Sequence, residues 1–168
     1  MTNDFFKRQL ASYAAVHRDR RNKVTHFIGV PVIVFSLLLV LTPWPLQLGG
    51  REVSGALVVA VLSVVGWMAL DLGIGLVMAA LMLVAWYAAE GLAAGLGSGA
   101  TWGVFLVLFV GAWVLQFVGH HYEGKRPALL DNIFQIFIAP MFLVAETMVA
   151  LGQRRDLAHL MDQAHTPG

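Results

Sequence analysis

Long apolar blocks alternate with short polar segments along the chain, and this pattern predicts a series of hydrophobic helices. The first block covers residues 24–41 and stops at the segment Thr42-Pro43-Trp44-Pro45. Two prolines so close together end a helix, because proline lacks the backbone N–H that the helix needs. A polar loop is expected over residues 42–53.

The next apolar region, residues 54–96, is too long to be one membrane helix. At 1.5 Å per residue it would be about 60 Å long, twice the roughly 30 Å hydrocarbon core of a bilayer. The region must therefore fold back on itself. Asp71 and the glycines of the segment LDLGIG mark the expected break, which gives helices near 54–70 and 74–95.

Two further helices are expected in the second half of the chain. A turn with the sequence GLGSGA leads to an apolar helix over residues 101–119, and the loop HHYEGKRPALLDN follows it. The last apolar block, residues 133–151, contains Pro140 and Glu146, so it is expected to be tilted, kinked or only partly inserted. The tail after Gly152 is polar and is expected to be frayed.

Residues 4–22 have a different pattern, that of an amphipathic helix. Phe6, Leu10, Tyr13 and His17 follow one another at spacings of four, three and four, which places them on one helix face. The same segment is basic, with Lys7, Arg8, Arg18, Arg20 and Arg21. This combination favours a helix that lies on an anionic membrane surface.

Composition supports a membrane protein. The chain is 58% hydrophobic and 12% charged, whereas a soluble domain is about 25% charged. We therefore predict an all-α, polytopic membrane helix bundle of four to five transmembrane helices plus the N-terminal amphipathic helix. Residues 1–168 form one domain, comprising an interfacial helix (1–23), the bundle (24–151) and a polar tail (152–168).

Charge and cysteine content restrict the function. A net charge of +1 without a basic stripe argues against nucleic acid binding. Because the chain has no cysteine, a metal site would have to use His, Asp, Glu or water. Six of the eleven Lys and Arg residues fall within residues 1–23, which predicts a cytoplasmic N-terminus.

Four of the six histidines are expected to meet at one membrane face. An even number of crossings returns His120 and His121 to the side on which His17 and His26 begin, so we expect the histidine cluster on the cytoplasmic side. His17 and His26 are nine residues apart, about 180° around a straight helix. They can share a site only if the chain breaks between them, and the polar run RDRRNK is the expected place.

Two helical spacings add polar groups to this cluster. His120 and Glu123 are three residues apart, and Asn22 and His26 are four apart, so each pair can share a helix face. Neutral imidazole is a common ligand of Zn, Fe, Cu and Ni. A single histidine at a membrane end is more often bonded to water or headgroups, but four of them converging favour a metal site.

Other ionisable residues are interpreted structurally. His159 and His165 lie in the polar tail and are expected to be solvated. Asp71 and Glu90 are expected to be helix-end or packing groups. Glu146 lies within an apolar helix, where its charge needs a partner.

Two segments resemble a known family. The segment YAAVHRDRRNKVTHFIGVP (13–31) carries its Tyr, His, Asn, His, Gly and Pro in the family spacing, and QFVGHHYEGKRPALLDNIFQIFIAPMFLVAE (116–146) resembles a second family motif. Together they resemble a family of small membrane proteins, once catalogued as a domain of unknown function and now associated with 2-hydroxy fatty acid dioxygenases. The resemblance covers nearly the whole chain.

The resemblance implies an Fe²⁺-dependent enzyme of fatty acid α-oxidation, which takes a long-chain 2-hydroxy fatty acid and O₂ and yields a chain one carbon shorter. The metal ligands it implies are His17, His26 and His120, with His121 as a further candidate. Glu123 is expected to bind the metal or to support a ligand, and Asn22 is a candidate catalytic residue. The candidate substrate-binding residues are Arg126, Lys125, Arg21 and Tyr13.

Two other functions stay open at this point. The chain is also compatible with a non-enzymatic membrane protein that binds lipid or a partner through its basic face. A zinc-dependent lipid hydrolase could use the same ligands.

Overall fold

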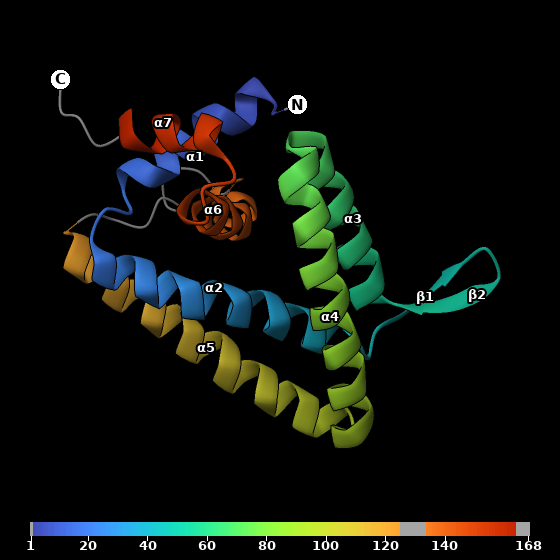
Figure 1. Cartoon of the computed structure of the whole chain (residues 1–168). Coiled ribbons are helices and arrows are strands. Elements are labelled where there is room, and N and C mark those ends of the chain that lie inside the picture. Colours follow the sequence, from blue (N-terminus) through green and yellow to red (C-terminus); the bar gives the residue numbers. More distant parts are fainter. Residues whose placement is uncertain (1, 125–133, 164–168) are drawn as a thin grey trace.

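The computed structural model describes residues 2–124 and 134–163, which are almost entirely helical (Figure 1). The helices are α1 (Asp4–Ala15), α2 (Arg20–Leu41), α3 (Gly55–Leu70), α4 (Leu72–Leu96), α5 (Ser98–Glu123), α6 (Phe134–Ala150) and α7 (Arg155–Gln163), and a hairpin of β1 (Pro45–Leu48) and β2 (Arg51–Ser54) joins α2 to α3. The predicted all-α helix bundle is confirmed.

Helices α2 and α5 lie side by side and antiparallel (Figure 1). Two glycines allow their close approach. A Cβ added at Gly29 would lie 2.2 Å from Nε2 of Gln116, and one added at Gly119 would lie 2.0 Å from Oγ1 of Thr25. The start of α2 is thereby held against the end of α5, as the return of the chain to one face predicts.

Helices α3 and α4 form a second pair, which crosses the first (Figure 1). Asp71 separates them and caps α4, because its Oδ1 accepts a hydrogen bond of 2.9 Å from the amide of Ile74. Gly75 packs on the backbone of Met68, where a Cβ would lie 2.6 Å from the Met68 Cα. The predicted break at Asp71 is confirmed.

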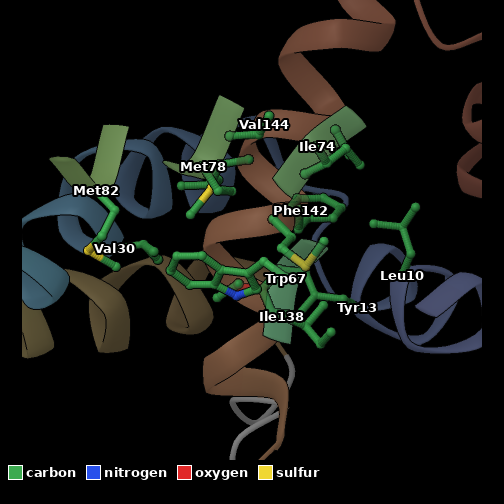
Figure 2. Close-up of a cluster of buried hydrophobic side chains, with 14 of the residues drawn as sticks. Leu10, Tyr13, Val30, Trp67, Ile74, Met78, Met82, Ile138, Phe142 and Val144 are labelled. Atoms are coloured by element: carbon green, nitrogen blue, oxygen red, sulfur yellow. The ribbon is translucent and has the colours of Figure 1, made fainter. Parts of the chain in front are cut away.

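Helix α6 connects these pairs to the N-terminal helix. In Figure 1 it is seen nearly end-on, with α1 and α7 on one side and α2 on the other. Figure 2 shows Ile138 and Phe142 of α6 in one cluster with Trp67 of α3 and Tyr13 of α1. The Trp67 indole donates a 2.9 Å hydrogen bond to the carbonyl of Phe137, so the buried ring is also paired.

The expectation for residues 4–22 is wrong in two respects. The helix ends at Ala15, and α2 begins at Arg20 because the Asp19 side chain accepts a hydrogen bond from the Arg21 amide and so caps a new helix. The apolar face of α1 is covered by α6 and α7 rather than by lipid: Phe6 and Leu10 are fully buried.

Two polar segments are more ordered than expected. The loop 42–53 contains the β1–β2 hairpin, in which Leu48 pairs with Arg51 across Gly49 and Gly50. Both glycines have positive φ, 58° and 77°, as a tight two-residue turn requires. The tail is not frayed over Arg155–Gln163, because α7 buries Leu157 completely.

The helices of the described residues suit a bilayer. Arg20–Leu41, Leu72–Leu96 and Ser98–Glu123 are long and apolar enough to cross it, and α6 with α7, bent by 114°, would count as a fourth span. Gly55–Leu70 is a shorter apolar helix. Many outward-facing residues are large and apolar, among them Val84 of α4 and Val107 of α5, which are 70% and 75% exposed. The chain is therefore associated with a membrane.

Candidate metal centre

Three imidazoles meet where α2 and α5 come together next to α1. His17 lies in the connection between α1 and α2, His26 in the second turn of α2, and His120 in the last turn of α5. One ring nitrogen of each lies within 4.8 Å of the others, and all three side chains are buried. The break before Arg20 is what brings His17 to His26, as the nine-residue spacing predicts.

Backbone carbonyls fix the tautomers of two of these rings. The Nδ1 atom of His17 lies 2.8 Å from the carbonyl oxygen of Tyr13, and Nδ1 of His26 lies 2.9 Å from that of Asn22. A carbonyl only accepts, so each Nδ1 carries the proton and donates. In a neutral imidazole the other nitrogen, Nε2, then has a free lone pair.

These two Nε2 atoms face each other at 3.0 Å. With both Nδ1 atoms donating, two lone pairs meet and no proton lies between them. Burial, together with the neighbouring His26, lowers the pKa of His17 to about 2, so protonation does not relieve the contact. A cation bound by both atoms would relieve it.

His120 completes a donor set that fits a divalent transition metal. Its Nδ1 is buried and has no hydrogen-bond partner among the described residues. Three imidazoles at one centre are a known ligand set for a catalytic metal with an open position. The side chains of His17, His26 and His120 could therefore hold the ion, with room for a small ligand.

The Glu123 carboxylate is directed at the connection before α2 rather than at the imidazoles. It accepts hydrogen bonds from the amides of Arg18 (3.0 Å) and Asp19 (2.8 Å) and from Nδ2 of Asn22 (3.1 Å). These bonds tie the last turn of α5 to the segment that carries His17. Glu123 and Asn22 thus hold the backbone that positions the candidate ligands.

The structure does not bring His121 or Arg21 to the centre. His121 is exposed, and its ring lies against that of Tyr122. The Arg21 guanidinium pairs with Asp19 at 2.8 Å and lies over the Tyr122 ring, with 64% of its side chain exposed. Lys125 and Arg126 lie outside the described residues.

Tyr13 does reach the site. Its ring stacks on that of His17, with centroids 3.9 Å apart and planes 2° from parallel. Burial and the Glu146 carboxylate raise the pKa of Tyr13, so its phenol stays neutral. It forms one wall of the site.

An apolar pocket extends from the imidazoles between α2, α5 and α6. Its apolar lining is Val30, Ile33, Val34, Leu37, Trp113, Ile136, Ala139 and Pro140, and its polar lining is Tyr13, His17, His26, His120, Gln116 and Gln135. Leu37 follows His26 by eleven residues of helix, about 16 Å at 1.5 Å per residue. The pocket therefore has a polar end at the imidazoles and an apolar body.

Sequence reasoning missed Gln116, Gln135 and Gly29 as parts of this site. A signal was present for two of them: Gln116 is four residues before His120, and Gly29 three after His26, spacings that share a helix face. Gln135 had no such signal, because it belongs to α6 and follows residues 125–133.

The structural interpretations of Asp71, Glu90, Glu146 and His159 are confirmed, and His165 lies outside the described residues. Glu146 forms the ion pair it needs with Lys23. Glu90 accepts hydrogen bonds from Ser54 and Trp86. His159 is exposed.

Comparison with known proteins defines the class. The family model described as 2-hydroxy-palmitic acid dioxygenase Mpo1-like matches residues 4–151, and the chain belongs to this family. The chain is 34% identical over 146 residues to the 2-hydroxy-palmitic acid dioxygenase MPO1 of Saccharomyces cerevisiae. The match covers 86% of this chain and 80% of the yeast protein. No solved structure matches. The resemblance noted in the sequence is thereby confirmed.

Proposed function

We propose that this protein is a membrane dioxygenase that shortens 2-hydroxy fatty acids by one carbon. The observation that carries the proposal is the pair of unprotonated Nε2 atoms of His17 and His26, 3.0 Å apart beside His120. They stand at the polar end of an apolar pocket, in a chain whose yeast relative is named a 2-hydroxy-palmitic acid dioxygenase.

The ion proposed for the site is Fe²⁺. Zinc is bound well by imidazole but has no redox chemistry, whereas a reaction that consumes O₂ requires electron transfer. An Fe²⁺ ion held by His17, His26 and His120 would supply the chemistry that activates O₂. The same ligand set with zinc would suit a hydrolase, so the identity of the metal separates these two functions.

The residues around the ion position the substrate and exclude water. The apolar side chains from Val30 to Leu37 suit an acyl tail, and the polar end suits its carboxylate. Tyr13 covers one face of the His17 ring. Glu123 holds the backbone at Arg18 and Asp19, which fixes His17 in place.

The proposed orientation has the N-terminus and the histidine centre on the cytoplasmic side. Support comes from the six Lys and Arg residues within residues 1–23, since such residues concentrate in cytoplasmic segments. A substrate whose tail lies in the bilayer could present its carboxylate at this level. Labelling of single cysteines introduced near residue 4 and in the hairpin would test the orientation.

Oxygen uptake with 2-hydroxypalmitate, followed by mass spectrometry for the acid one carbon shorter, tests the activity. We expect uptake with 2-hydroxypalmitate and none with palmitate, and about one iron per chain by elemental analysis. Metal content that is unchanged in a His26→Ala, His120→Ala double variant would rule out this centre. Hydrolysis of a lipid ester without oxygen uptake would favour the zinc enzyme, and no bound metal would favour a non-enzymatic lipid-binding protein.

A further inference from the structure

The side chain of Gln116 is buried and unpaired. It is 4% exposed, and neither its Nε2 nor its Oε1 has a hydrogen-bond partner among the described residues. Buried amides are almost always paired, because each unpaired polar atom costs free energy of desolvation that nothing returns. An amide left with both its donor and its acceptor free therefore indicates a ligand.

Gln116 lines the pocket next to the candidate metal centre. It lies four residues before His120 on α5, and both line the pocket. On the facing helix α2, Gly29 leaves the space that the amide occupies, since a Cβ there would lie 2.2 Å from Gln116 Nε2. The polar region continues onto α6, where Gln135 donates to Gln9 at 2.7 Å and its Oε1 has no partner within the described part of the chain.

We propose that Gln116 recognises the 2-hydroxyl group of the substrate, an inference that rests on the proposed function. An ionised carboxylate only accepts hydrogen bonds, whereas a hydroxyl also donates. A simple fatty acid can therefore satisfy only the Nε2 of Gln116. A 2-hydroxy acid satisfies both atoms, with Nε2 donating to the carboxylate and Oε1 accepting from the hydroxyl.

This pairing gives the pocket a preference that does not depend on the metal. Palmitate has no hydroxyl, and 2-oxopalmitate has an oxygen at the same carbon that cannot donate. With either acid, Oε1 of Gln116 stays buried and unpaired. One lost hydrogen bond of this kind corresponds to roughly a tenfold weaker affinity.

The test is displacement of a fluorescent fatty acid from metal-free protein in lipid nanodiscs, so that chelation by a metal contributes nothing. Wild-type protein is expected to bind 2-hydroxypalmitate roughly tenfold more tightly than palmitate or 2-oxopalmitate. Gln116→Leu and Gln116→Met, which keep the volume and remove the polar atoms, are expected to bind all three acids about equally. Gln47→Leu, on the exposed hairpin, is the matched control and is expected to keep the preference.

Oxygen uptake by the iron-loaded wild type, measured in parallel, distinguishes a failure of the proposed dioxygenase function from a failure of the proposed role of Gln116. If it consumes oxygen with 2-hydroxypalmitate and the folded Gln116 variants keep the binding preference, this inference is overturned and the proposed function stands. Equal binding of the three acids by wild-type protein overturns the inference without any variant. Absence of both oxygen uptake and preference would remove the proposed function and this inference together.

Discussion

Two buried polar clusters join distant parts of this chain, and they differ in how completely their atoms are paired. At Asp71, one carboxylate oxygen accepts from the Ile74 amide (2.9 Å) and from Arg154 (3.0 Å). The other accepts from Thr2 (2.6 Å) and again from Arg154 (2.9 Å). At the histidine centre, by contrast, lone pairs of His17 and His26 face each other at 3.0 Å.

The pairing of buried polar atoms distinguishes a structural cluster from a binding site. Burial raises the pKa of Asp71, but hydrogen bonds from Arg154, Ile74 and Thr2 outweigh it and hold the pKa at about 2. That cluster is complete as it stands and fastens the chain ends to the α3–α4 turn. Nδ1 of His120 and both amide atoms of Gln116 have no partner in the part of the chain that the structure describes, and a bound molecule could supply one.

The largest effect is expected at the histidine centre. His120→Ala should abolish oxygen uptake and metal binding while the helices still insert, because insertion follows hydropathy. Oxygen consumption with 2-hydroxypalmitate and iron content are measured on variants shown to be folded in detergent. His159→Ala, at an exposed residue of α7, serves as the control and should keep both. Full activity in folded His120→Ala would contradict the proposed centre.

Substitutions in the Asp71 cluster should instead lower the free energy of unfolding. Asp71→Asn keeps the helix cap but leaves Arg154 with only its exposed partner Asp156. Removal of one member of a buried pair costs about 3–5 kcal/mol, and the remaining pair places the expected loss at the lower end. Denaturant unfolding in detergent measures this loss. Asp156→Asn, which removes the 58% exposed partner of Arg154, should cost less than about 1 kcal/mol. Loss of metal from folded Asp71→Asn would contradict the purely structural role of the Asp71 cluster.

Substitution of Glu123 tests whether this side chain positions His17 or binds the metal itself. Glu123→Gln replaces an oxygen that accepts from backbone amides by an NH₂ group that cannot accept, so His17 loses its fixed position. Metal affinity should fall roughly 10- to 100-fold, the usual effect of removing a group that orients a ligand. Glu52→Gln on the hairpin is the matched control. A loss as complete as that of His120→Ala would show that Glu123 binds the metal itself.

The smallest effect is expected from pH. The pKa of Asp71 is about 2 in the folded protein against 3.8 for the free side chain, so its stabilisation is complete above about pH 5 and is lost as the pH falls through about 2. The loss is at most about 2 kcal/mol. Unfolding between pH 5 and pH 2.5 should show it as a difference between wild type and Asp71→Asn. Parallel curves for the two proteins would mean that Arg154 does not hold the carboxylate charged.

Hydropathy was sufficient to predict the helices that face lipid, because their signal is local. Asp71 as the break between α3 and α4 and the return of His120 to the level of His26 both followed from block lengths. The position of the break before Arg20 was less accessible. It depends on the Asp19 cap and on Glu123, which comes from a helix far along the chain.

The features that could not be predicted depend on tertiary partners. Leu10 and Phe6 give the same periodic pattern whether lipid or protein covers them, and here α6 and α7 do. Leu157 belongs to a polar segment, and its burial could not be predicted because it depends on the contact of α7 with α1. Gln116 stands at the start of a family motif, but a sequence does not show whether its amide has hydrogen-bond partners.

The pairing of α2 with α5 also sets the order of events during synthesis. Asn22 and Glu123, which are in contact, are 101 residues apart in the chain. A ribosome adding about 5–20 residues per second needs roughly 5–20 s to make the intervening segment. During that interval α2 enters the membrane with His26 but without His120, so the centre is incomplete. A metal held by all three histidines could therefore be loaded only onto a chain whose synthesis has passed the end of α5, which would make membrane insertion and metal acquisition separate steps.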